Sequence, residues 1–383
     1  MPRVALLDLH AEYRLFRDDV RRAVEEVLES QQFINGPAVG ELERSLSGRF
    51  GARCGVAVSS GTDALLVSLM ALGVGPGDEV IVPTFTFFAT AGVVARLGAR
   101  PVFVDIDPRT FNLDVSQALR AITGRTRAIV AVHLFGQCAD LEALREGARG
   151  HSIPIVEDAA QAIGAKFSGK AAGLLGDAGC LSFYPTKNLG GFGEGGFVMT
   201  DDEDLGERVR QLRHHGESRR YVHERVGGNF RLDTMKAAIL LVKLNKLEDF
   251  TRRRRENALL YDELLKGSPV ATPWVDDRCY HVYHQYSMLG ERRDALIAFL
   301  GDRGVQTGVY YPIPLHRQPC FQGLGYAEGS LPVSESVARR IVSLPCHPMM
   351  SEEDVRYVAA SVREFYGGGD RAGQKPGAVT SVH

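Results

Sequence analysis

The sequence has no large excess of either charge and no long apolar run. It contains 45 lysines and arginines against 47 aspartates and glutamates, a formal net charge of −2 over 383 residues. No overall field therefore draws the chain to nucleic acid or to an anionic membrane. The longest uncharged stretch, Val80–Ala95, contains Pro83 and falls short of the roughly 20 apolar residues that a spanning helix needs. We expect neither a nucleic-acid partner nor a membrane segment.

Cysteine is scarce and scattered. The six cysteines form no C-x-x-C pair, so neither a zinc site nor a disulfide framework is expected, and no metal is predicted. The first residues, MPRVALLDLHAEYRLF, lack the apolar core and the small-residue cleavage site of a signal peptide. A reducing, cytoplasmic location is the default expectation.

Short β-rich runs alternate with helical patterns through the first half of the chain. Helical spacing covers Asp63–Leu72, Thr86–Leu97 and Ala139–Ala148. This alternation predicts an α/β fold with a mostly parallel, seven-stranded sheet that is covered on both faces. The expected strands are Val56–Ser59, Glu79–Pro83, Pro101–Ile106, Arg127–His133, Pro154–Asp158 and the two stretches AGCLSFY and GGFVMTD.

The second half of the chain changes pattern. One long helical pattern runs from Thr234 to Leu265, and strands and helices start again after Ser268. We expect a large domain over residues 1–250, with an N-terminal helical segment, and a smaller C-terminal α+β domain over residues 251–366. The Gly-rich end, residues 367–383, is expected to be a disordered tail. Arg252–Arg255 could indicate RNA binding, but four arginines on one helix are more typical of a solvated face or an interface rim.

A single lysine, Lys187, lies in the stretch SFYPTKNLGGFGEGG. Gly191, Gly193 and Gly196 match the dinucleotide fingerprint G-x-G-x-x-G, which is meaningful only where it joins a strand to a helix. The residues that follow, GGFVMTDD, are typical of a strand. Nucleotide binding is therefore not predicted from this match.

Informative residues follow the carboxyl ends of the expected strands, the edge where open α/β sheets bind ligands. Gly61 and Thr62 follow the first strand and begin a helix. A small residue and a hydroxyl at a helix N-terminus are typical of a phosphate site, and also of plain capping.

Three other strand ends hold an aromatic residue, a carboxylate and the lysine. Phe87 follows one strand, either as a flat surface for a ligand or as core. Asp158 ends another, with Gln161 one helical turn later. A buried carboxylate is costly unless it is paired, so a function and a structural ion pair both stay open. Lys187 lies on the loop after CLSFYP.

A phosphate cradle, an aromatic surface, a buried carboxylate and a lysine fit pyridoxal 5′-phosphate (PLP) better than any other cofactor. The carboxylate would keep the ring nitrogen protonated, and the lysine would form a Schiff base with the aldehyde. The glycines would let the backbone pass close to the cofactor. The sequence therefore predicts a covalent catalytic role for Lys187.

At these residues the sequence resembles the sugar aminotransferases of the DegT/DnrJ/EryC1/StrS family, within the fold-type I PLP enzymes. The resemblance runs from ALLDLHAEY to about Phe365. It is carried by the combination of SSGTDAL, PTFTFFATA, VEDAAQAIGA, SFYPTKNLGGFGEGG and NFRLDTMKAAIL. It implies a large domain with a mostly parallel sheet, a smaller C-terminal domain, and a homodimer with shared active sites.

The resemblance also implies a cofactor site. Lys187 would be the catalytic lysine bonded to PLP, and Asp158 would be the carboxylate beside the ring nitrogen. Phe87 would stack on the ring, and Asn229 would reach the phosphate from the neighbouring subunit. The implied cofactor-binding residues are Gly61, Thr62, Phe87, Asp158, Gln161, Ser182, Lys187 and Asn229.

For the substrate, the stretch HHGESRRYVHERVGGNFRLDTMKAAIL is most similar to members that act at C-3 of a UDP-linked 2-acetamido-3-keto-uronate. Arg231 would then bind the sugar carboxylate. Tyr310, at a position where those relatives tend to have histidine, Tyr311 and His316 are implied near the substrate, with a packing role as the alternative for His316. L-glutamate is implied as the amino donor.

Other functions stay open from the sequence. They are an aminotransferase for a dTDP- or GDP-linked 3- or 4-keto-6-deoxysugar, a PLP-dependent dehydratase, lyase or decarboxylase, and a regulatory protein that has kept the fold. Related dehydratases replace the lysine with histidine, and a regulatory homologue would have lost Lys187 or Asp158. Both residues are present.

Overall fold

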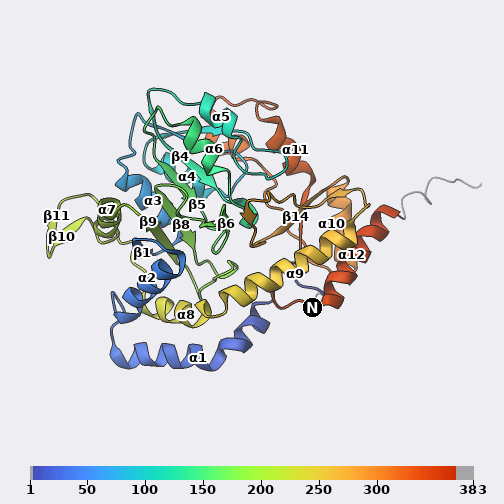
Figure 1. Ribbon diagram of the computed structural model, residues 1–383, viewed down its shortest axis with the longest axis horizontal. Coiled ribbons are helices and arrows are strands. Elements are labelled where there is room, and N and C mark those ends of the chain that lie inside the picture. The colour runs from blue at the N-terminus through green and yellow to red at the C-terminus, as the bar shows by residue number, and fades with distance from the viewer. Residues whose placement is uncertain (1–2, 368–383) are drawn as a thin grey trace, which may run out of the picture.

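The computed structural model describes residues 3–367 (Figure 1). All but the first residue of the expected tail, 367–383, lies outside the described residues, and Gly367 ends helix α12. None of the helices in the described part is long and apolar enough to cross a bilayer. The α-helices are α1 (Leu9–Ser30), α2 (Pro37–Phe50), α3 (Gly61–Ala71), α4 (Ala89–Arg96), α5 (Val115–Arg120), α6 (Leu141–Gly147), α7 (Glu203–Arg213), α8 (Thr234–Leu244), α9 (Leu247–Leu265), α10 (Arg293–Asp302), α11 (Pro332–Arg340) and α12 (Glu352–Gly367).

A seven-stranded sheet forms the centre of the fold, in the order β1-β9-β8-β5-β4-β2-β3. Only β9 runs against the others, because it pairs antiparallel with both β1 and β8 while the remaining pairs are parallel. The mostly parallel sheet predicted from the sequence is confirmed. Its strands are β1 (Cys54–Val58), β2 (Glu79–Pro83), β3 (Arg100–Val104), β4 (Thr126–Val132), β5 (Ile155–Asp158), β8 (Ala178–Ser182) and β9 (Gly196–Thr200).

Both faces of this sheet are covered by apolar side chains. Successive residues of a strand point to opposite faces, and in β4 Ile129 packs in one buried cluster while Val130 packs in the other. Helices α2, α6 and α8 contribute to the first cluster, and α3, α4 and α7 to the second. Two-sided burial explains why the strands are almost continuously apolar.

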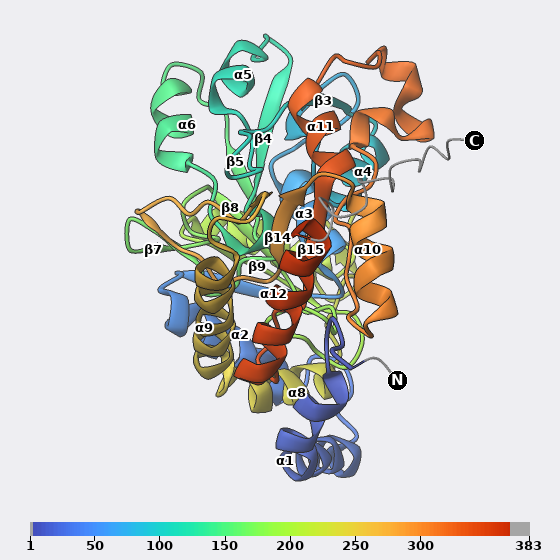
Figure 2. The ribbon, with the colours of Figure 1, turned by 90° about the vertical axis from the view of Figure 1, so that its right-hand side faces the viewer.

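The C-terminal part has its own small sheet, in the order β12-β14-β15. Helices α9, α10 and α12 supply most of the helical residues of the buried cluster around it, and α9 and α12 lie together in Figures 1 and 2. The expected domain boundary at residue 250 stays a prediction; it falls inside α9. The remaining strands are β6 (Lys166–Phe167), β7 (Lys170–Ala171), β10 (Glu217–Arg219), β11 (Val222–His223), β12 (Val270–Ala271), β13 (Cys279–Tyr280), β14 (Tyr286–Gly290) and β15 (Ile341–Leu344).

The helical pattern from Thr234 to Leu265 forms two helices instead of one. The chain leaves the helix after Leu244 and starts α9 at Leu247. Ala237, Leu240 and Leu244 of α8 belong to the buried cluster on one face of the large sheet, whereas the buried side chains of the C-terminal half of α9 belong to the C-terminal cluster. The expectation of one helix is wrong because the two halves are buried in different cores.

The arginine cluster on α9 is not a uniform solvated face. Arg252 is exposed and pairs with Glu256 at 2.7 Å, as expected. Arg254 is only 3% exposed, and its guanidinium donates to the backbone carbonyl of Cys346 at 2.8 Å. The expectation of a solvated face or interface rim is wrong for Arg254, which is a structural residue of the interior.

Candidate active site

The sheet brings the predicted site residues to one edge. Strands β1, β2, β5 and β8 all run in the same direction, so their carboxyl ends meet there. The segments after these ends carry Gly61, Phe87, Asp158 and Lys187. Parallel pairing is therefore the reason that residues up to 126 positions apart can share a site.

The N-terminus of α3 points its first backbone N–H groups toward this edge. Ser60 caps the helix, because its Oγ accepts a hydrogen bond from the backbone N of Asp63 at 3.0 Å. Gly61 and Thr62 provide the first two N–H groups of the helix, which have no partner within it. Thr62 is exposed, so its hydroxyl is free to meet an anion.

Two glycines allow this helix end to lie against β8 and β9. A Cβ atom on Gly61 would come within 2.6 Å of the Cβ of Ser182. A Cβ on Gly196 would overlap the carbonyl of Ser60. At Gly196 the close approach that glycine allows is to the backbone of Ser60, within the protein itself. It brings Gly61, Thr62 and Ser182 together as one cradle.

Asp158 ends β5 and is 6% exposed. Its Oδ2 accepts a hydrogen bond from Thr90 Oγ1 at 2.8 Å, and its Oδ1 accepts one from the backbone N of Ala160 at 3.2 Å. Burial raises the pKa of Asp158, while these two donors and the charge of Lys187 oppose the shift. No carboxylate–arginine or carboxylate–lysine ion pair within 4.0 Å involves Asp158 in residues 3–367, so the alternative of a structural ion pair loses support.

Thr90 is a further candidate site residue that the sequence reasoning missed, because its hydroxyl donates to Asp158. It lies on α4, and its hydroxyl is also 3.2 Å from the hydroxyl of Thr86. The sequence holds only an indirect signal, two threonines four positions apart in PTFTFFAT, and Thr86 itself precedes α4, which begins at Ala89. A pair of buried hydroxyls points to a polar partner, here Asp158.

Lys187 lies on the loop after β8. Pro185 in this loop helps to end the strand, because proline has no N–H to donate to the neighbouring strand. The loop is closed by two backbone bonds, from Lys187 N to Tyr184 O at 2.8 Å and from Gly191 N to Phe183 O at 2.7 Å. Burial lowers the pKa of Lys187 to about 8, and the Asp158 carboxylate opposes that shift. A neutral amine is accordingly accessible near physiological pH.

Tyr311 joins two of the predicted cofactor residues, Gln161 and Phe87, at the edge of the sheet where Asp158 lies. The Nε2 of Gln161 donates to the Tyr311 hydroxyl at 3.0 Å, and its Oε1 accepts from the backbone N of Phe135 at 2.7 Å. The Phe87 ring lies 6.2 Å from that of Tyr311 and is 55% exposed. An uncovered aromatic face beside a buried carboxylate favours the ligand-surface interpretation of Phe87 over the core interpretation.

The predicted substrate residues differ in how accessible they are. Tyr310 is partly buried, with its ring 6.0 Å from that of Tyr311. His316 is 1% exposed, and both ring nitrogens have partners, Thr84 at 2.7 Å and Glu335 at 3.1 Å. Desolvation lowers the pKa of His316. This geometry supports the packing role of His316 and leaves no free polar atom for a substrate.

Asn229 and Arg231 lie apart from Lys187 along the chain but near the end of β1. Arg231 forms a β-bridge with Val58, and its Nη1 is 2.6 Å from Nδ1 of His214. The Nε of Arg231 is buried without a hydrogen-bond partner. Asn229 is exposed. A guanidinium with an unsatisfied N–H suits an anionic ligand.

These residues fit PLP in three independent ways. The cradle at Gly61 and Ser182 is one that a Cβ would fill. The exposed ring of Phe87 has Tyr311 as its one aromatic neighbour within residues 3–367, and Asp158 is a buried acceptor. Phosphate, planar ring and pyridine nitrogen each have a matching partner. The lowered pKa of Lys187 suits the fourth group, the aldehyde.

Comparison with known proteins identifies the family. The sequence pattern of the DegT/DnrJ/EryC1/StrS aminotransferase family matches residues 16–363. A pleiotropic regulatory protein of Geobacillus stearothermophilus is 49% identical over 95% of this chain and 98% of its own length. The UDP-2-acetamido-2-deoxy-3-oxo-D-glucuronate aminotransferase of Pseudomonas aeruginosa is 44% identical over 94% and 99%.

A solved structure agrees with these relatives. The crystal structure of S. venezuelae DesV in complex with a ketimine intermediate is 42% identical and superimposes with a TM-score of 0.93, covering 96% of this chain and 99% of DesV. The fold-type prediction is thereby confirmed. The chain is a PLP-dependent sugar aminotransferase and belongs to the DegT/DnrJ/EryC1/StrS aminotransferase family.

Proposed function

We propose that this aminotransferase moves the amino group of L-glutamate to the C-3 keto group of a UDP-linked 2-acetamido-3-keto-uronate. The observation that carries the acceptor is Arg231, whose buried Nε has no partner and whose charge has no carboxylate within 4.0 Å in the described residues. The relative from Pseudomonas aeruginosa that is named for this substrate supports the same proposal.

The chain's own groups would perform the proton transfers. Gly61, Thr62 and Ser182 would hold the PLP phosphate, and Asp158 would hold a proton on the ring nitrogen. When bound, PLP supplies an electron sink for the carbon that loses its proton. The amine of Lys187, with its pKa lowered to about 8, would take that proton from the α-carbon of the donor and deliver it to C4′ of the cofactor, on the other side of the amino nitrogen.

A second acceptor class is favoured by one observation. Tyr310 occupies the position where relatives acting on the uronate tend to have histidine, and it lies next to Tyr311 at the site. This substitution favours an aminotransferase for a dTDP- or GDP-linked 3- or 4-keto-6-deoxysugar. A purely regulatory role, as the name of the Geobacillus relative suggests for that protein, would not require Lys187 and Asp158 to be placed as they are.

Replacing Arg231 with methionine separates the two acceptors. We expect kcat/KM for the UDP-linked 3-keto-uronate to fall roughly 10- to 100-fold, because a charge-assisted hydrogen bond is worth about 1.5–3 kcal/mol. The measurement is formation of 2-oxoglutarate from L-glutamate with each acceptor. For the corresponding UDP sugar with a hydroxymethyl group in place of the carboxylate, kcat/KM should change by less than about threefold.

Arg356→Met serves as the matched control, since Arg356 is exposed and, among residues 3–367, forms its one ion pair with Glu352 on its own helix. The Arg356→Met variant should keep the wild-type kcat/KM for both acceptors. Equal losses on the acid and on the neutral acceptor in Arg231→Met would contradict carboxylate recognition. Turnover of a dTDP-linked 3-keto-6-deoxysugar alone, with no turnover of either UDP sugar, would establish the second acceptor class.

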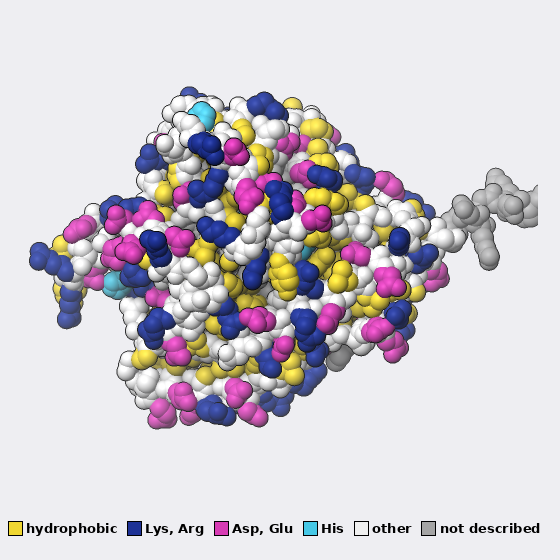
Figure 3. Space-filling view, in the orientation of Figure 1, with side chains coloured by type: hydrophobic (Ala, Val, Ile, Leu, Met, Phe, Trp, Pro, Cys, Tyr) yellow, Lys and Arg dark blue, Asp and Glu magenta, His cyan; other side chains and the backbone are white. Residues whose placement is uncertain are grey.

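We also propose a homodimer in which each site is completed by the other subunit. The hairpin of β10 and β11 projects from the body in Figure 1, and basic side chains gather on it in Figure 3. Tyr221 is 78% exposed and Val226 is 91% exposed, and aromatic residues next to arginines are typical of interfaces. Asn229 follows this hairpin and is exposed, as a residue donated to a neighbour would be.

Mixing two inactive variants tests the shared site. In a hybrid dimer of Lys187→Ala and Asn229→Ala subunits, one site keeps both the lysine of one chain and the asparagine of the other. Random pairing in a C2 dimer makes half of the dimers hybrid, so we expect about a quarter of the wild-type activity after unfolding and refolding the mixture. Activity no higher than the sum of the separate variants would show that Asn229 acts within its own chain.

A further inference from the structure

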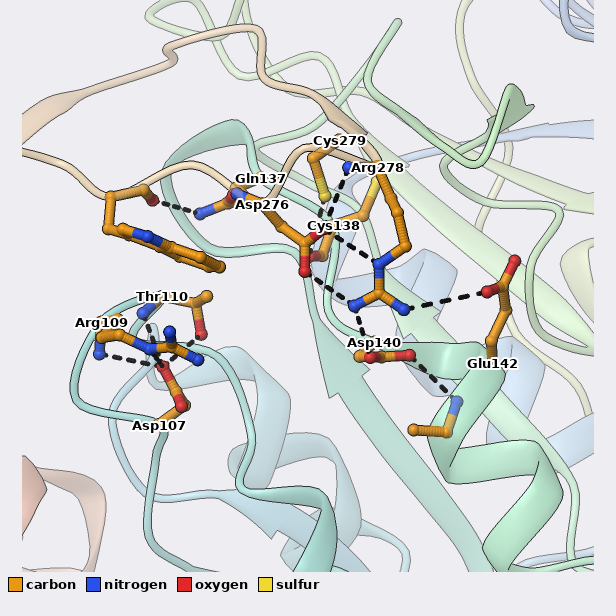
Figure 4. Close-up of polar contacts among 12 residues, drawn as sticks. Asp107, Arg109, Thr110, Gln137, Cys138, Asp140, Glu142, Asp276, Arg278 and Cys279 are labelled. Carbon is orange, nitrogen blue, oxygen red and sulfur yellow. Dashed lines mark hydrogen bonds and ion pairs between the residues drawn. The ribbon is translucent and has the colours of Figure 1, made fainter.

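One connecting segment, residues 274–285, links β12 to β14 of the C-terminal sheet and packs on its way against the loop that follows β4 of the large sheet. Figure 4 shows its first half against loops of the large sheet. The backbone N of Asp276 donates to Gln137 at 2.8 Å, and Arg278 pairs with Asp140 at 2.8 Å and with Asp276 at 2.7 Å. Strand β13 then pairs with β6. The segment is therefore held against the large sheet before it reaches the site.

The second half of the segment contacts the neighbours of two predicted cofactor residues. Val282 N donates to Gly136 O at 3.0 Å and Gln285 N to Phe135 O at 3.3 Å. Phe135 in turn donates its N–H to Gln161. The chain then enters β14 of the C-terminal sheet at Tyr286. The segment thus connects that sheet to the backbone that orients Gln161.

Asn188, the residue after Lys187, is bound by the same segment. It is 7% exposed, and its Nδ2 donates to the carbonyl of Val282 at 3.2 Å. Its Oδ1 therefore faces the Nδ1 of His284, at 3.3 Å. Because an amide oxygen can only accept, Nδ1 of His284 must carry the hydrogen.

His284 is held from the other side by the C-terminal part of the fold. It is 5% exposed. The buried guanidinium of Arg254 on α9 donates to the carbonyls of His284 and Tyr283, each at 3.4 Å, and to that of Cys346 at 2.8 Å. Desolvation lowers the pKa of His284, and the charges of Lys187 and Arg254 lower it further. His284 is accordingly neutral, with one N–H to donate.

We propose that His284 is a positioning residue for Lys187: its Nδ1–H bond to Asn188 fixes the lysine loop to the connecting segment, and so to the C-terminal sheet. The placement of Lys187 then depends on two anchors. One is the pair of backbone bonds that close the loop, and the other is the Asn188–His284 bond. This inference rests on the proposed role of Lys187, but whether His284 holds the lysine loop in place can be measured without turnover.

The test compares His284→Leu with His284→Asn in the full chain. Leucine removes the donor, whereas asparagine keeps an N–H close to the position of Nδ1. We expect hydrogen exchange of the Lys187 and Gly191 amides, with and without PLP, to become about tenfold faster in His284→Leu and to stay near wild type in His284→Asn. The rate of the half-reaction with L-glutamate should fall roughly 10- to 100-fold in His284→Leu alone.

His281→Leu is the matched control. His281 is also buried in this segment, but its Nδ1 accepts from the backbone N of Tyr283 and has no bond to Asn188. It should leave exchange at Lys187 and Gly191 unchanged. If His284→Leu fails to fold, Asn188→Leu removes the same hydrogen bond from the other partner.

Unchanged exchange in His284→Leu, or equal losses in His284→Leu and His284→Asn, would overturn the proposal. So would faster exchange with a normal half-reaction. If Lys187→Ala retained turnover, the proposed role of Lys187 would fail instead, and the exchange result would still decide whether His284 fixes the loop.

Discussion

Lys187→Ala should lower turnover with L-glutamate and a keto sugar by roughly 10⁴-fold or more, because it removes both the covalent attachment of PLP and the proton carrier. The measurement is a single-turnover assay, with the absorbance of added PLP as a check that the cofactor still binds. Folding should be unimpaired. Burial lowers the pKa of Lys187 from 10.5 to about 8, so protonation of this amine opposes folding, by an amount that grows as the pH falls from 10.5 to about 8 and is constant below. The alanine variant is relieved of this cost.

Lys187→Arg is the control that distinguishes loss of the positive charge from loss of the reactive amine. Arginine keeps a cation near Asp158 but stays protonated at all working pH values, so it can neither form the bond to PLP nor accept a proton. We expect it to be as inactive as alanine. Retained transamination by either variant would show that Lys187 does not carry the reaction.

Asp158→Asn has the second largest expected effect. An amide cannot hold a proton on the ring nitrogen, so the half-reaction with L-glutamate should slow by roughly 10²- to 10⁴-fold. The free energy of unfolding should rise or stay constant in this variant. Burial raises the pKa of Asp158, which means that its ionisation opposes folding at neutral pH, and the neutral amide removes that cost. Thermal unfolding of the chain without PLP checks this second part.

Thr90→Val provides a graded comparison. It removes the donor to Oδ2 of Asp158 without removing the carboxylate, so we expect a smaller loss, of about tenfold. A variant of Asp158 that unfolds the protein while the half-reaction of the folded fraction stays normal would make Asp158 a structural residue. A loss for Thr90→Val as large as that for Asp158→Asn would show that orientation matters more than charge.

The cofactor side of the site could be predicted from the sequence because it depends on strand ends. Gly61, Phe87, Asp158 and Lys187 each follow an apolar strand that periodicity locates within a few residues. Parallel strands place all such ends at one edge. The residue types then narrow the ligand, since a carboxylate and a lysine are rarely buried without a use.

The supporting residues could not be predicted in the same way. Thr90, Asn188 and His284 act through contacts between segments that are distant in sequence, such as the 96 residues between Asn188 and His284. Local patterns contain no information on which of many buried polar residues will meet. The burial of Arg254, which the pattern on α9 assigned to a solvated face, has the same origin: its partners are carbonyls of Cys346, His284 and Tyr283.

The sequence by itself determined the α/β class, the strand ends and the presence of Lys187 and Asp158 at two of those ends. Those features follow from periodicity, from the direction of strands and from residue type, all of which act over a few neighbours. Only the tertiary structure decided where the helical pattern from Thr234 to Leu265 breaks, that His316 is enclosed, and that His284 meets Asn188. These depend on which core each segment is buried in, and burial is a property of the whole chain because the apolar area removed from water is shared between distant segments.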